Sequence, residues 1–141
     1  MEFKIIIITT PGCILNEQII REIVNIKDGN SLKISKDENL GTLEIKKIIS
    51  AILDGFDGIF IIIKGKTKDG KIYSNYDSFI KVIEEANRIL EKRNFGNNRV
   101  TFCYWGGKSS QELTEEFRRF YNNIKSLGLN PLNQEKLELH V

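Results

Sequence analysis

The alternation of strand-like and helix-like segments constrains the fold of this chain more than any other feature. Phe3–Ile8 and Ile59–Ile63 are unbroken runs of mostly β-branched apolar residues, the pattern of a strand covered on both faces. Apolar residues recur at helical spacing in four other segments, Leu15–Ile26, Thr42–Leu53, Tyr76–Lys92 and Ser110–Leu127. The remaining expected strands are Ser31–Ser35 and Arg99–Trp105. Leu137–Val141 either adds an edge strand or forms no strand.

Strands that alternate with helices of this length predict a parallel sheet with helices on both faces, joined by right-handed crossovers. A chain of 141 residues suits one domain. We therefore expect residues 1–141 to form a single flavodoxin-like, three-layer α/β domain with a four- to five-stranded, mainly parallel sheet. Sites in such sheets lie at the carboxyl ends of the strands. The loops expected at that edge are Thr9–Ile14, Lys36–Gly41, Lys64–Asn75 and Gly106–Ser110.

Composition excludes several classes of protein. The 21 Lys and Arg residues against 19 Asp and Glu give a net charge of +2, so bulk charge predicts no nucleic-acid partner. The apolar runs are too short to cross a bilayer, and no export signal is evident at Met1–Lys4, so we expect a cytoplasmic protein with no membrane partner. The two cysteines, Cys13 and Cys103, supply neither a disulfide framework nor four thiolates for a metal.

Several short motifs resemble a known family. The run Gly55–Ile61 reads GFDGIFI and is followed, after a polar loop, by YSNY at Tyr73–Tyr76. Further on, Arg99-Val100 opens an expected strand, and Leu127–Leu132 reads LGLNPL. From about Cys13 to Leu132 the chain resembles the delta subunit family of methyl-viologen-reducing hydrogenase, whose members also serve heterodisulfide reductase complexes.

The resemblance implies a flavodoxin-like fold with one [2Fe–2S] cluster, which passes electrons between a hydrogenase and a flavin-bearing reductase subunit. The positions that match the cysteines of the family are Thr10, Cys13, Asn39, Lys64 and Asp69. Such a cluster needs about four thiolate or imidazole ligands. Since Cys13 is the one thiol left at these positions, we expect no cluster, no other cofactor and no metal.

The resemblance then implies a non-catalytic structural or adaptor subunit in an anaerobic electron-transfer complex. Its expected partners are protein subunits, a hydrogenase or a flavoprotein like heterodisulfide reductase. The sequence is also compatible with a homodimer. The residues expected to form a partner or anion surface are Lys66, Lys68, Tyr73, Asn75, Tyr76 and Trp105. No catalytic residues are predicted, because the one histidine, His140, lies near the end of the sequence and paired carboxylates such as Glu84-Glu85 lie on exposed helix faces.

An alternative function is the binding of FMN or another phosphorylated molecule at Thr9–Cys13 and Gly106–Ser110. Tyr73, Tyr76, Tyr104 and Trp105 would then stack on a ring, although packing or interface roles explain them better. Cys13 is either a reactive thiol or, more simply, a small buried hydrophobe, and Cys103 is expected in the core. The lysines of Lys64–Lys71 have two interpretations. They bind an anion or an acidic partner surface, or they lie in a solvated loop without a binding role.

Overall fold

The computed structural model describes residues 3–9, 20–21, 31–36, 45–64, 76–105 and 110–132. Ile20 and Arg21 are helical. The strands are β1 (Lys4–Thr9), β2 (Ser31–Lys36), β3 (Gly58–Lys64) and β4 (Val100–Trp105). The helices are α2 (Ile45–Leu53), α3 (Tyr76–Lys92) and α4 (Ser110–Leu127).

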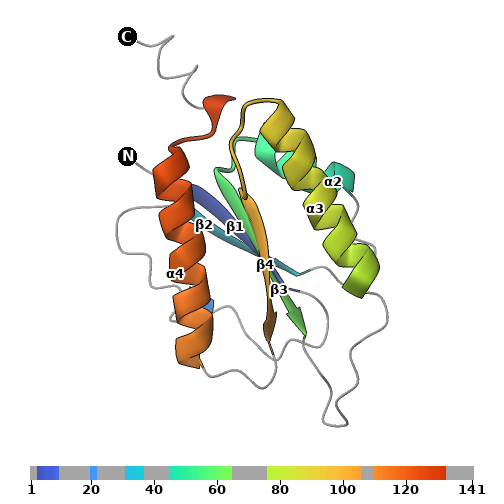
Figure 1. Ribbon diagram of the computed structural model, residues 1–141. Helices are drawn as coiled ribbons and strands as arrows, with labels where there is room; N and C mark the ends of the chain where they lie inside the picture. Colours follow the sequence, from blue (N-terminus) through green and yellow to red (C-terminus); the bar gives the residue numbers. More distant parts are fainter. Residues whose placement is uncertain are drawn as a thin grey trace.

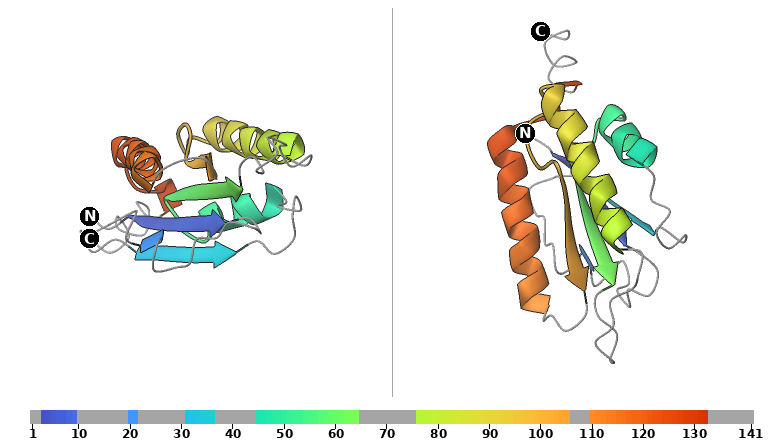
Figure 2. Two further views of the ribbon diagram at one scale, coloured as in Figure 1. Left: turned by 90° about the horizontal axis from the view of Figure 1, so that it is seen from below. Right: turned by 45° about the vertical axis from the view of Figure 1, so that its right-hand side comes forward.

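The four strands form one parallel sheet in the order β2-β1-β3-β4. In the register, Ile7 lies opposite Ile34 on one side and Phe60 on the other, and Ile61 lies opposite Phe102. Figure 1 looks onto the β4 edge of this sheet, with α4 against one face and α2 and α3 against the other. The left view of Figure 2 shows the strands stacked from β4 to β2. The expected flavodoxin-like α/β architecture is confirmed.

Each face of the sheet has its own hydrophobic core. On the α4 face the core is rich in aromatic side chains, and the rings of Phe117 and Phe120 each lie 5.3 Å from the ring of Phe60. On the α2–α3 face it is mostly isoleucine, with Ile48 and Ile52 of α2 fully buried. Alternate residues of a strand point to opposite faces, so the apolar runs of β1 and β3 supply both cores at once.

Each of the helices α2, α3 and α4 is followed by a left-handed residue, which after α4 is Gly128 with a φ of 85°. Gly55, with a φ of 103°, follows α2, and the N–H of Phe56 donates to the carbonyl of Ala51 at 3.2 Å. Asn94, with a φ of 66°, follows α3, and the N–H of Phe95 donates to the carbonyl of Leu90 at 3.0 Å. This is the Schellman arrangement, in which the N–H groups of a left-handed residue, most often glycine and sometimes asparagine, and of the residue after it donate to the last helical carbonyls. Gly55 therefore caps the carboxyl end of α2.

The helices α3 and α4 have the bounds that the sequence predicts for them. The four strands begin and end within about one residue of their expected ranges. Of the helix expected at 15–26, the structure describes Ile20 and Arg21. The possible edge strand Leu137–Val141 lies outside the described residues. In the described part of the chain, no helix is both long enough and apolar enough to span a membrane.

Candidate functional site

The carboxyl edge of the sheet is where the sequence predicts a site, and the structure describes the strand ends that reach it. Lys64 ends β3 and Trp105 ends β4, and these two residues are partners in the register of the parallel pair. Thr9 ends β1 and is buried, with 2% of its surface exposed. Tyr76 is the first residue of α3. The fold therefore brings Lys64 and Trp105, two of the predicted site residues, side by side at this edge.

The other predicted site residues follow these strand ends and lie outside the described residues. They are Thr10, Cys13, Asn39, Lys66, Lys68, Asp69, Tyr73 and Asn75. Their expected roles as remnants of a ligand set or as a partner surface stay predictions.

Cys103 is a core residue, as expected. It lies in β4 with 5% of its surface exposed, on the sheet face that packs against α4. Tyr104 packs on the opposite face beside Phe102, their rings 5.8 Å apart, which supports a packing role. Within the described ranges, no group of three or more His, Cys, Asp or Glu side chains is placed to hold a metal ion.

The most elaborate polar arrangement that the structure describes lies at the opposite, amino edge of the sheet. Its members are Asp57, Arg99 and Asn130, which we call the amino-edge network. All three are almost completely buried, with exposed fractions of 0%, 2% and 0%. Buried polar groups of this kind are stable only when their hydrogen bonds are satisfied.

Asp57 joins the start of β1 to the segment that follows α4. One carboxylate oxygen, Oδ2, accepts the backbone N–H of Lys4 at 2.7 Å, and the other, Oδ1, accepts the backbone N–H of Asn130 at 2.5 Å. The backbone N–H of Asp57 also donates to the carbonyl of Lys4 at 2.7 Å. A single side chain thus connects the start of β1, 53 residues before it, to a segment that lies 73 residues after it.

Arg99 and Asn130 extend the network to further backbone carbonyls. The Arg99 guanidinium donates to the carbonyls of Asp57 at 2.9 Å, Gly128 at 3.2 Å and Leu129 at 3.4 Å, and also to that of Phe95. The Asn130 amide donates to the carbonyl of Ile52 at 2.7 Å and that of Phe56 at 3.0 Å. The end of α4 is thereby tied to the ends of α2 and α3.

The charges of the amino-edge network are balanced within it. Burial lowers the pKa of the Arg99 guanidinium from its ordinary value, while the nearby Asp57 carboxylate acts in the opposite direction. The guanidinium donates to the backbone carbonyl of Asp57, so the positive charge of Arg99 lies close to the residue that carries the negative charge. Burying the charges of Arg99 and Asp57 costs desolvation energy, which well-formed hydrogen bonds must offset. The arrangement holds the start of β1, the end of α2 and the segment after α4 together.

Gly58, which follows Asp57, is required by the close approach of α4. A Cβ atom at Gly58 would lie 2.7 Å from Cζ of Phe120 and 2.8 Å from Cδ1 of Ile124. Asp57, Gly58, Arg99 and Asn130 belong to three of the four motifs that carry the resemblance. These motif positions therefore have structural roles, which sequence reasoning did not assign to them.

The comparison with protein families agrees with the motifs. A family model described as "Methyl-viologen-reducing hydrogenase, delta subunit" matches residues 23–128, which is most of the chain. The match includes Asp57, Gly58 and Arg99, begins after Cys13 and stops before Asn130. No curated protein matches the sequence.

Proposed function

The chain belongs to the methyl-viologen-reducing hydrogenase delta subunit family, and we propose that it serves a redox complex as an adaptor subunit without an iron–sulfur cluster. The proposal rests on one observation, the shortage of sulfur and imidazole ligands. The sequence contains two cysteines and one histidine. Cys103 is buried in the core, so Cys13 and His140 are the donors that remain. A [2Fe–2S] cluster needs about four.

The residues at the matching positions also oppose an iron site chemically. Lys64 stands where the family resemblance implies a ligand, at the end of β3. An ammonium group has three donors and no acceptor, so it repels an iron ion and cannot coordinate it. The fit of this chain to the cluster is therefore poor, and no electron-transfer step is assigned to it.

A retained docking surface is the second part of the proposal. Lys64 and Trp105 are neighbours at the carboxyl edge, and the loop that follows β3 carries Lys66 and Lys68. Clustered lysines bind acidic surfaces, and exposed Trp and Tyr side chains are common anchors of protein interfaces. We propose that this edge binds an acidic face of a hydrogenase or of a flavoprotein like heterodisulfide reductase.

Anaerobic isolation of the tagged chain from its native host tests the adaptor role. We expect a stoichiometric complex that contains a hydrogenase, iron–sulfur or flavin subunit. The double charge reversal Lys66→Glu with Lys68→Glu should weaken this complex by about tenfold or more, because like charges across an interface cost several kcal/mol. A complex-free, monodisperse chain would contradict the proposal.

The matched control for this experiment is the double variant Lys92→Glu with Lys125→Glu. Both lysines are exposed and lie in the last turns of α3 and α4, at the amino edge. We expect this variant to bind as the unchanged chain does. Equal loss in both double variants would show that overall charge, and not the carboxyl edge, governs binding. Flavin absorbance of the isolated chain would favour the alternative, FMN-binding function.

A further inference from the structure

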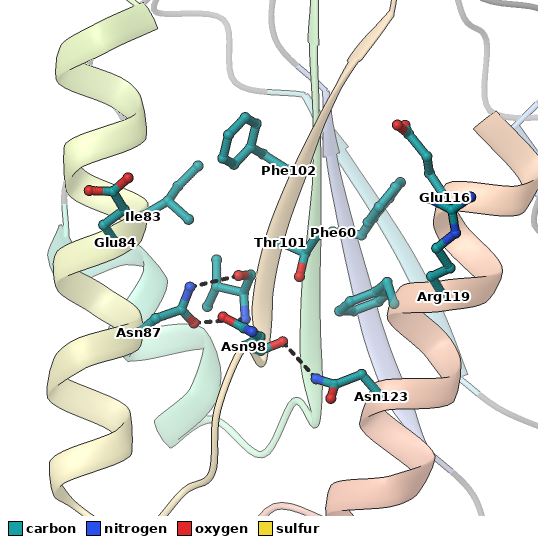
Figure 3. Close-up of a pocket in the computed structure, with 12 residues that line it drawn as sticks. Phe60, Ile83, Glu84, Asn87, Asn98, Thr101, Phe102, Glu116, Arg119 and Asn123 are labelled. Carbon is teal, nitrogen blue, oxygen red and sulfur yellow. Dashed lines mark hydrogen bonds between the residues drawn. The ribbon is translucent and has the colours of Figure 1, made fainter. Parts of the chain in front are cut away.

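Two grooves flank helix α3, and they differ in their chemistry. The groove between α3 and α4 lies beside β4 and has a volume of about 580 Å³. Figure 3 shows that amide side chains of both helices bind the chain at the start of β4 here. The Asn87 amide donates to the carbonyl of Val100 at 2.8 Å, and the Asn123 amide donates to that of Asn98 at 3.2 Å. This groove also carries charges of both signs, so we assign no partner to it.

The groove on the other side of α3, which we call the α2–α3 groove, is mainly apolar. It has a volume of about 700 Å³. The right view of Figure 2 shows α2 beside the half of α3 that leads to its carboxyl end. Apolar side chains that remain accessible in a groove mark a binding site. Those that line this one are Ile45, Ile49 and Leu53 on α2, Ile89 and Leu90 on α3, and Phe95.

Helix α2 is apolar over a wider face than the sheet covers. Ile48 and Ile52, one turn apart, pack on the sheet and are fully buried. Ile45, Ile49 and Leu53 form a second row, because residues four apart lie on the same face of a helix. Ile45 and Ile49 are half-buried, and Leu53 has 59% of its surface exposed. The neighbouring α3 therefore covers this second row only in part.

The end of α3 forms the other wall of the α2–α3 groove. Ile89 is half-buried there, whereas Leu90 is buried. The left-handed turn at Asn94 directs the chain back, and the half-buried Phe95 that follows it also lines the groove. These residues come shortly before the start of β4, so this wall lies toward the amino edge of the sheet. The α2–α3 groove is thus separate from the partner surface proposed at the carboxyl edge.

The charged side chains that line the α2–α3 groove in the described part of the chain are both basic. Lys46 on α2 and Arg93 after α3 are exposed and belong to opposite walls. Among the described residues, the acidic Asp54 and Glu91 are close to these walls in the sequence but do not line the groove. An apolar floor between two positive side chains is complementary to an apolar stripe between negative ones.

We propose that the α2–α3 groove binds an amphipathic helix of a partner protein, whose apolar stripe is flanked by acidic side chains. Helices bind to such grooves through apolar side chains at positions i, i+4 and i+7. Three side chains at this spacing extend over about 10.5 Å of a helix, and the row from Ile45 to Leu53 extends over about 12 Å. The acidic flanks of the bound helix then meet Lys46 and Arg93.

The same charges argue against a second copy of this chain in the groove. A two-fold interface places the same patch of both copies face to face. Lys46 and Arg93 of one copy would then face Lys46 and Arg93 of the other, and like charges across an interface weaken it. An acidic partner avoids this repulsion, so the chemistry of the groove favours a different protein.

Titration of the purified full chain with synthetic helical peptides, followed by NMR, tests the proposal. The probe is a peptide of about five turns, with leucine at positions i, i+4 and i+7 and glutamate on both sides of this stripe. The comparison peptide has lysine in place of every glutamate. We expect the glutamate peptide to bind about tenfold or more tightly than the lysine peptide, and to shift the amide signals of Ile49 and Leu53.

Two variants of the chain locate the binding. Leu53→Gln removes an exposed apolar contact and should weaken binding of the glutamate peptide by about fivefold. Lys46→Glu with Arg93→Glu should reverse the preference, so that the lysine peptide binds more tightly. The matched control is Arg118→Glu with Arg119→Glu, which makes the same change of charge at exposed positions of α4, on the other face of the sheet. We expect this control to keep the preference of the unchanged chain.

Three results would overturn the proposal. Equal binding of the two peptides would show that the basic side chains select no partner. No binding of the glutamate peptide is the result if another segment of this chain covers the groove. Self-association of the chain that Leu53→Gln abolishes would place a second copy there. None of these results bears on the partner surface at the carboxyl edge, so the two proposals fail separately.

Discussion

Replacing Asp57 with alanine should lower the free energy of unfolding by about 3–5 kcal/mol, the range for breaking a buried charged network. The substitution removes the acceptor of the part-buried backbone N–H of Lys4 and of the buried backbone N–H of Asn130. It also leaves the Arg99 guanidinium without its neighbouring negative charge. Urea denaturation followed by circular dichroism measures the change.

Asp54→Ala is the control for this prediction. Asp54 lies three residues earlier, in the turn after α2, and is exposed. We expect its replacement to change stability by no more than about 0.5 kcal/mol. If Asp57→Ala does not fold, Asp57→Asn retains one acceptor oxygen and should give a smaller, measurable loss. Equal stability of Asp57→Ala and Asp54→Ala would contradict the structural role of the amino-edge network.

Replacing Arg99 with methionine should cost a similar amount, about 3–5 kcal/mol. Methionine fills much of the same volume but removes the donors to the carbonyls of Phe95, Asp57, Gly128 and Leu129. Arg99→Lys should rescue only part of the loss, because one ammonium cannot reproduce the planar donor geometry of a guanidinium. Arg93→Met, at an exposed position after α3, serves as the control in the same denaturation experiment.

The double variant Asp57→Ala with Arg99→Met separates a shared network from two independent contacts. Residues in one network show coupling energies of about 0.5–3 kcal/mol. We expect the double variant to lose less stability than the two single variants do in sum. Simple additivity would mean that Asp57 and Arg99 stabilise the fold independently.

The amphipathic helices were the most predictable part of the fold. In α3 and α4 the apolar residues recur with the helical period over about five turns, and the sheet buries that stripe in each case, as for Ile83 and Phe117. The parallel sheet followed from the same logic, since β1 and β3 are apolar on both faces.

The amino-edge network could not be predicted in the same way, because its contacts are not local. Asp57 and Asn130 are 73 residues apart, and their hydrogen bond leaves no periodic signal in the sequence. Arginine is rarely fully buried, so nothing near Arg99 indicates that its side chain is enclosed. The motifs indicate that these positions matter. Their structural roles depend on contacts between three segments that lie far apart in the sequence.

The described residues that hold the fold together and the positions at which we propose that cluster ligands are missing lie at opposite edges of the sheet. The motif residues Asp57, Gly58 and Arg99 hold strands and helices together at the amino edge. The positions matched to cluster ligands follow the strands at the other edge, as Lys64 does at the end of β3. Substitutions at one edge therefore need not disturb the packing at the other.

Iron and acid-labile sulfide analysis of the chain, produced and purified anaerobically without any partner subunit, tests the proposed absence of a cluster most directly. We expect neither iron nor sulfide in stoichiometric amount and no visible absorbance from a cluster. Two irons and two sulfides bound per chain, the content of a [2Fe–2S] cluster, would contradict this proposal.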